Sequence, residues 1–139
     1  MHAEKVSGRG ISIFAVIIGV AINNIGTVAS NLAVFLFLAS HNVPMEEIRL
    51  RLHSISGLLL SAIISLGFTG IGGYCAAWIA RRSPILHGGV VAVVSLLLSL
   101  LCWEPSVPLW YNILLHGGAV PAGVIGGYLA SSDRKAALR

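Results

Sequence analysis

Long stretches without charged residues constrain this chain more than any other feature of its sequence. They lie between Arg9 and Glu46, between Arg51 and Arg81, between Arg82 and Glu104, and between Glu104 and Asp133. A helix needs about 20 mainly apolar residues to cross the hydrocarbon core of a bilayer. Each stretch is long enough, and only 10% of all residues are charged, whereas soluble domains have about 25%. We therefore predict an all-α polytopic membrane protein, a single membrane domain over 1–139 with four transmembrane helices near residues 11–39, 54–80, 85–103 and 108–130.

The first apolar stretch follows Lys5 and Arg9, as the core of a secretory signal would. It is much longer than the roughly 7–15 residues of a signal core, and no A-x-A-like cleavage site closes it. We expect it to remain in the protein as a transmembrane helix.

The basic residues are distributed unevenly between the two sides of the predicted membrane. Seven of the nine Lys and Arg residues lie before the first helix, between the second and third, or after the fourth. Cytoplasmic segments of membrane proteins are the richer in Lys and Arg, so we expect both termini to be cytoplasmic. The net charge of +4 then serves orientation and contact with the lipid bilayer, and we expect no nucleic-acid partner.

The four letters IGGY occur twice, at 71–74 and 125–128. When the two copies are aligned, small residues recur at every fourth position of the second and fourth predicted helices. These small-residue ridges contain Thr69, Gly73 and Ala77 in one helix and Ala119, Gly123 and Gly127 in the other. Such ridges allow membrane helices to approach closely, so we expect them to pack against helices of the same chain or of another chain.

The same match fits two tandem helical hairpins related by a pseudo-two-fold axis, as in transporters with parallel repeats. It also fits chance similarity between two glycine-rich helices, because the first and third predicted helices show no convincing match. Both interpretations stay open.

The segment 72–89 reads GGYCAAWIARRSPILHGG. It resembles a segment of small uncharacterised bacterial four-helix membrane proteins, in which GGY or GGF and a small residue are followed by basic residues and a glycine-bearing helix start. The resemblance implies no activity, and it implies a location in the cell inner (plasma) membrane.

Polar residues inside a transmembrane helix mark either a functional site or bonds between helices. In the first predicted helix, Asn23, Thr27 and Asn31 are four residues apart and share one face, with Asn24 beside them. An amide in hydrocarbon without a partner costs roughly several kcal/mol, so this stripe must face protein or water. It consists either of amides that bond across helices or of a surface that lines a hydrated or ligand-binding space.

His116 lies about a third of the way along the fourth predicted helix from the outside, at a depth similar to that of Asn31. A buried neutral imidazole needs a donor and an acceptor, and an Asn side chain can provide either. Pro121 on the same helix removes a backbone hydrogen bond and favours a kink. The candidate polar patch is Asn31, Asn112 and His116, as a proton or ligand site or as a structural histidine with satisfied bonds.

The remaining segments carry fewer signals. We expect the second helix to start outside the membrane near Pro44, with an amphipathic outer part and a bend at Gly57. The third helix is almost entirely aliphatic, which predicts lipid contact, and His87 at its start is expected to be an interfacial residue with no other role.

Enzymatic chemistry finds little support in the sequence. No acidic residue lies within a predicted membrane span, and there is no phosphate-binding loop, dinucleotide fingerprint or G-x-S-x-G motif. The acids and histidines outside the helices do not have the spacing of metal ligands. We expect a non-enzymatic protein that binds no metal and no resident cofactor.

Three functions are compatible with these features. The first is helix–helix association, as a homo-oligomer or as a small subunit of a membrane complex, because of the small-residue ridges and the short loops. The second is a small channel or carrier for a neutral or weakly charged solute, because of the Asn stripe and His116. The third is an accessory chain that holds a lipid, quinone or pigment.

Overall fold

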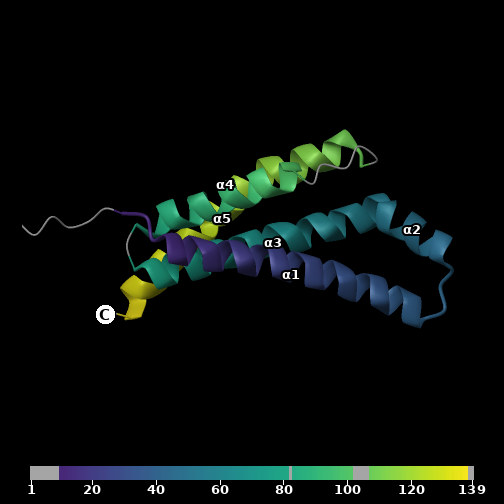
Figure 1. The fold of residues 1–139 in the computed structure, drawn as a ribbon, viewed down its shortest axis with the longest axis horizontal. Coiled ribbons are helices and arrows are strands. Elements are labelled where there is room, and N and C mark those ends of the chain that lie inside the picture. Colours follow the sequence, from purple (N-terminus) through teal and green to yellow (C-terminus); the bar gives the residue numbers. More distant parts are fainter. Residues whose placement is uncertain (1–9, 82, 102–106, 138–139) are drawn as a thin grey trace, which may run out of the picture.

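The computed structural model describes residues 10–81, 83–101 and 107–137, and five α-helices lie within them (Figure 1). They are α1 (Ile13–Ser40), α2 (Met45–His53), α3 (Ile55–Ala80), α4 (Pro84–Leu101) and α5 (Leu109–Ala137). All except α2 are long and apolar enough to cross a bilayer. The predicted all-α fold with four long apolar helices is confirmed, and by helix length and hydropathy the chain is a multi-pass membrane protein.

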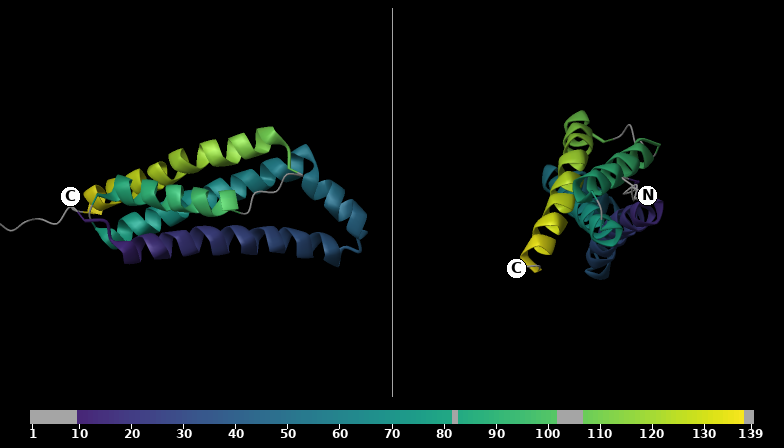
Figure 2. Two further views of the ribbon diagram at one scale, coloured as in Figure 1. Left: turned by 45° about the horizontal axis from the view of Figure 1, so that its top comes forward. Right: turned by 90° about the vertical axis from the view of Figure 1, so that its left-hand side faces the viewer.

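The four long helices run side by side in an elongated bundle (Figures 1 and 2). At one end, which we call the terminal end, α1 and α4 begin and α3 and α5 finish; α2 lies at the other end, the α2 end. α3 is central, because it packs against α1, α4 and α5. Among the described residues α1 does not pack against α5, and the two lie on opposite edges of the bundle in the left view of Figure 2.

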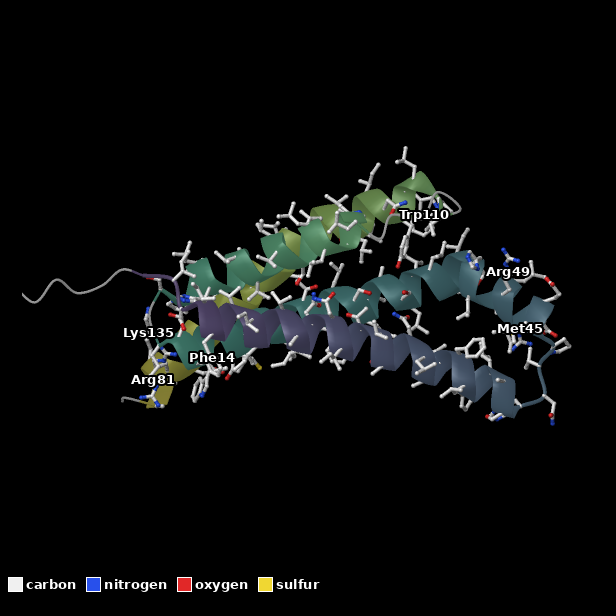
Figure 3. All side chains as sticks on the ribbon, in the orientation of Figure 1. Phe14, Met45, Arg49, Arg81, Trp110 and Lys135 are labelled. Atoms are coloured by element: carbon white, nitrogen blue, oxygen red, sulfur yellow. The ribbon has the colours of Figure 1, made fainter. Side chains whose placement is uncertain are left out.

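The surface of the bundle suits a lipid bilayer. Large apolar side chains are exposed along the long helices, and Phe14 of α1 and Ile63 of α3 are each 68% exposed. Charged side chains lie at the ends: Figure 3 shows Arg49 at the α2 end, and Arg81 and Lys135 at the terminal end. An apolar surface between two charged ends is the pattern that a bilayer requires.

The segment between α1 and α3 differs from the prediction of one helix bent at Gly57. The helix breaks at Ser54, whose backbone is extended (φ −67°, ψ 160°). The Ser54 hydroxyl accepts a hydrogen bond from the Gly57 N–H (3.2 Å) and donates one to the Arg51 carbonyl (2.6 Å), so it caps both helices. Gly57 has a different role, because a Cβ there would collide with the Arg51 carbonyl at the end of α2.

The last helix extends further than predicted, to residue 137 rather than 130, and it continues unbroken through Pro121. In this extension Arg134 Nη2 donates to the carbonyl oxygens of Ala77 (3.0 Å) and Trp78 (3.2 Å) of α3. The last carbonyls of a helix have no partner within it, so Arg134 caps α3. Helix α4 ends at Leu101, and the next two residues that we expected in it lie outside the described residues.

The two small-residue ridges meet within the chain, near the terminal end. A Cβ on Gly73 of α3 would lie 2.6 Å from the carbonyl oxygen of Gly123 in α5. A Cβ on Gly123 would lie 2.6 Å from the carbonyl oxygen of Gly88 in α4, and one on Gly127 would lie 2.5 Å from that of Pro84. The backbones of α3, α4 and α5 are therefore in direct contact, which only glycine permits at these positions.

Helix α1 joins the same packed region through α3. A Cβ on Gly19 would lie 2.6 Å from the Gly72 carbonyl oxygen. Ala77, from the α3 ridge, is fully buried, and Ala119 of the α5 ridge is 8% exposed. In the described residues, the glycines of both ridges thus pack against helices of the same chain.

The two helical hairpins, α1 with α3 and α4 with α5, do not pack in equivalent ways. α3 packs extensively against α5, as a duplicated hairpin predicts. However, α4 packs against α3, whereas in the described ranges α1 and α5 make no contact. A two-fold axis would make these two pairs alike, so the packing departs from pseudo-two-fold symmetry.

Candidate functional site

A cavity of about 140 Å³ lies between the four long helices. Its polar lining comes from all of them: Asn23, Asn24 and Thr27 of α1, Ser65 and Thr69 of α3, Ser95 and Ser99 of α4, and His116 of α5. Apolar residues such as Leu66 and Leu96 complete the wall. The cavity reaches the surface of the bundle on the α1 side, where the lining residues Asn24 and Val28 are exposed.

Asn23 and Thr69 form a buried bridge between α1 and α3. Thr69 Oγ1 lies 3.1 Å from Asn23 Oδ1 and 2.9 Å from the Ser65 carbonyl oxygen, and it donates its single proton to these two acceptors. Asn23 is 7% exposed and Thr69 is 5% exposed. Because a buried amide without partners is costly, this bridge fixes the register of α1 against α3.

Two serines bring α4 into the site. Ser99 donates to the Leu96 carbonyl oxygen of its own helix (2.9 Å). Ser95 is 5% exposed, and within the described residues its Oγ makes no hydrogen bond. Buried hydroxyl groups are normally bonded, so Ser95 has its full hydrogen-bonding capacity available to a molecule in the cavity.

His116 contributes an imidazole from α5. Its Nδ1 lies 2.7 Å from the Asn112 carbonyl oxygen, and because a carbonyl only accepts, Nδ1 carries the proton. This bond orients the ring along the helix. Asn112 itself is buried, and its Nδ2 donates to the Val107 carbonyl oxygen (3.5 Å) rather than lining the cavity.

Asn31 lies one helical turn beyond the cavity, toward the α2 end. Its Oδ1 accepts a hydrogen bond from Ser61 Oγ (3.2 Å), and Ser61 Oγ also lies 3.2 Å from the Tyr111 hydroxyl. Its Nδ2 donates to the Thr27 carbonyl oxygen (3.0 Å). The hydrogen-bonded series Asn31–Ser61–Tyr111 connects α1 to α5 through α3. In the described residues, α1 and α5 do not pack directly against each other.

The predicted polar residues are therefore divided between two places. Asn23, Thr27 and His116 meet at the cavity, whereas Asn31 and Asn112 are bonded outside it. Residue counting along two helices predicts a common depth, but it does not give the direction in which each side chain leaves its helix. Of the small-residue ridges, Thr69 and Ala119 also line the cavity, and the glycines pack the helices.

Ser95 and Ser99 were not predicted, because we expected α4 to contact mainly lipid. That expectation is wrong for one face of α4, on which Ala92 is fully buried. Gly88, Ala92, Ser95 and Ser99 follow one another at helical spacing and share this face. This run of small and polar residues is the signal in the sequence that could have identified the buried side.

His87 is another residue whose role the sequence did not predict. It is fully buried rather than interfacial. Its Nε2 accepts a hydrogen bond from the Ser12 backbone N–H (2.9 Å), and its Nδ1 donates to the Ser83 carbonyl oxygen (3.0 Å). Ser12 is the N-cap of α1, so His87 ties the start of α1 to the start of α4.

The side chains that line the cavity indicate which kind of molecule it can bind. Comparisons of the chain with protein-family models, with curated proteins and with solved structures give no match, and the resemblance of segment 72–89 to bacterial membrane proteins stays a prediction. Among the residues that the structure describes, no Asp, Glu, Lys or Arg belongs to the lining. Hydroxyl, amide and imidazole groups can hold an uncharged molecule by hydrogen bonds, whereas an ion would lose its hydration without a compensating charge.

Proposed function

We propose that this protein binds a small uncharged solute in the cavity between its four long helices and carries it across the bilayer, without enzymatic chemistry and without a cofactor. The observation that supports this function is the polar lining to which each of the four spanning helices contributes. Polar groups at membrane depth face protein or water and mark solute pathways. A cavity bounded by all four helices also changes shape whenever they move relative to one another, as a carrier requires.

Association with other chains, as a homo-oligomer or as a subunit of a larger complex, is the alternative function. Its main support in the sequence was the pair of small-residue ridges. Gly73, Gly123 and Gly127 of these ridges pack against other helices of the same chain, so they are not exposed to a partner. We therefore place association second.

We further propose that the protein lies in the inner membrane of a bacterial cell, with its terminal end facing the cytoplasm. Arg81 and Lys135 lie at that end (Figure 3), and Arg134 caps α3 there. Basic residues are enriched on the cytoplasmic side of membrane proteins. The solute would then pass between this side and the α2 end.

Solute flux into liposomes tests the proposed function. Purified protein in sealed liposomes is challenged with a panel of small uncharged solutes and monovalent ions, and volume changes are followed by light scattering. We expect an uncharged solute to enter faster than into empty liposomes. The variant Ser99→Phe places an aromatic ring in the cavity and should reduce entry to the level of empty liposomes.

Val93→Phe is the matched control, because Val93 lies on the same helix and is 44% exposed on the outside of the bundle. It should carry solute as the wild type does. Wild-type flux equal to that of empty liposomes for every solute in the panel contradicts the function, and so does equal flux in wild type and Ser99→Phe.

A further inference from the structure

Two hydroxyl groups of the cavity lining, those of Thr69 and Ser99, present acceptors to a bound molecule. A hydroxyl has one proton and two lone pairs. The proton of Thr69 is directed to Asn23 and to the Ser65 carbonyl, and the proton of Ser99 is directed to the Leu96 carbonyl. Their lone pairs therefore remain for hydrogen-bond donors inside the cavity.

Asn24 adds a further acceptor to the lining. Its Nδ2 donates to the Val20 carbonyl oxygen of its own helix (2.8 Å), which directs part of its donor capacity away from the cavity. Its Oδ1 can only accept. A molecule without O–H or N–H groups would leave these acceptors of Thr69, Ser99 and Asn24 unpaired, so the lining favours one that carries such groups.

Ser95 is a buried residue of this lining whose hydroxyl can both donate and accept. Its Oγ is buried and makes no hydrogen bond within the described part of the chain, unlike Ser99 one turn further along α4. A solute that bonds to Ser95 satisfies a group that is otherwise unsatisfied, and this contribution is larger than that of a bond replacing an existing one.

The dimensions of the cavity limit the solute. Its volume of about 140 Å³ is close to that of an apolar protein cavity of about 150 Å³ that holds one benzene molecule. The cavity therefore accommodates a molecule of about six non-hydrogen atoms. The described part of the lining has no charged side chain, which favours a neutral molecule over an ion.

We infer that the solute is a small neutral molecule with several hydrogen-bond donors, of the chemical class of short polyols and primary amides, and that Ser95 contacts it directly. This inference rests on the proposed function, because it names the class of solute for the same cavity. Glycerol and urea represent the two forms of this class. 1,2-Dimethoxyethane has a size similar to that of glycerol but no donor, so it separates the donor requirement from size.

Binding is measured by saturation-transfer NMR on the full-length protein in lipid discs, which does not depend on transport. Glycerol and urea should bind and displace each other, and neither 1,2-dimethoxyethane nor Na⁺ or K⁺ should displace them. Ser95→Ala, a substitution that removes no hydrogen bond within the described residues, should weaken glycerol binding about fivefold. Ser95→Thr, which keeps the hydroxyl, should retain binding, and Val93→Ala on the exposed side of α4 should not affect it.

Displacement of glycerol by the ether or by a cation overturns the inference, as does unchanged binding in Ser95→Ala or no binding of glycerol and urea to the wild type. Liposome flux separates this inference from the proposed function. If uncharged solutes cross the membrane whether or not they have hydrogen-bond donors, transport is upheld and the inference about the class of solute is overturned. Donor-selective, Ser95-dependent binding without any flux upholds the inference and overturns carriage.

Discussion

The imidazole of His87 joins the start of α1 to the start of its own helix, α4, and both of its ring nitrogens are hydrogen-bonded. One nitrogen accepts from the backbone of Ser12 and the other donates to the backbone of Ser83. The N–H groups in the first turn of a helix have no partner within that helix, so the side chain of another helix can supply one. His87 thereby takes part in fixing where α1 begins.

Replacing His87 by Leu should destabilise the protein. Leu has a similar bulk but cannot accept from the Ser12 N–H, and a buried donor left without a partner costs about 1–3 kcal/mol. The measurement is the thermal unfolding midpoint in lipid discs. His53→Leu is the control, because His53 is exposed at the end of α2. Equal midpoints for His87→Leu and His53→Leu would contradict the structural role of His87.

At the scale of elements, the sequence predicts the four long helices within a few residues, apart from the end of α5, because charge and hydropathy decide where a chain can cross lipid. The break at Ser54 is harder to predict. The apolar stripe through Ile48 continues past it, and Ile48 is 2% exposed in α2. The extension of α5 was missed because Arg134 belongs to a charged segment, whose helicity is stabilised by its bonds to α3.

The candidate site was predictable in part. Asn23, Thr27 and His116 stand out because amide, hydroxyl and imidazole groups are rare in apolar helices. Ser95 and Ser99 do not stand out, because a serine in a membrane helix commonly bonds to its own backbone, as Ser99 does. Their role depends on which face of α4 is buried, and tertiary packing decides that.

Ser54 separates α2 from α3, and its removal should affect both. In Ser54→Ala the Gly57 N–H loses its acceptor, and loss of an N-cap costs about 1 kcal/mol. Amide hydrogen exchange measured by NMR should become faster at Gly57. Ser54→Thr keeps the hydroxyl and should preserve the slow exchange. An unchanged Gly57 exchange rate in Ser54→Ala would show that the cap does not hold the start of α3.

The whole molecule is tightly packed in one half and more open in the other. Glycine contacts bring α1, α3, α4 and α5 together near the terminal end. Toward the α2 end α1 and α3 diverge (Figures 1 and 2), and a groove of about 890 Å³ lies between them and α2, lined by residues that include Phe37 and Leu58. The polar cavity lies in the interior of the same bundle, farther from the terminal end than the packed glycines.

The packed half should tolerate no added methyl group. Gly73→Ala places a Cβ 2.6 Å from the Gly123 carbonyl oxygen, so α3 and α5 must separate, and overpacking of this kind costs about 1–3 kcal/mol. Gly67→Ala on the same helix is the matched control, because a Cβ there meets nothing within 4 Å. Thermal unfolding in lipid discs should show a lower midpoint for Gly73→Ala only. A midpoint equal to that of the wild type would contradict the backbone contact.

Thiol labelling at position 99 tests most directly whether a solute reaches the cavity from the aqueous phase. Ser99→Cys and Leu97→Cys are made in a chain in which Cys75 and Cys102 are replaced by Ala, and each is exposed in sealed liposomes to a membrane-impermeant thiol reagent. We predict that Ser99→Cys reacts from either side of the membrane and that glycerol slows the reaction. Leu97→Cys, at a position 58% exposed on the apolar outside of the bundle, should face lipid and stay protonated and unreactive. A Ser99→Cys as inert as Leu97→Cys, or one that glycerol does not protect, would contradict the account.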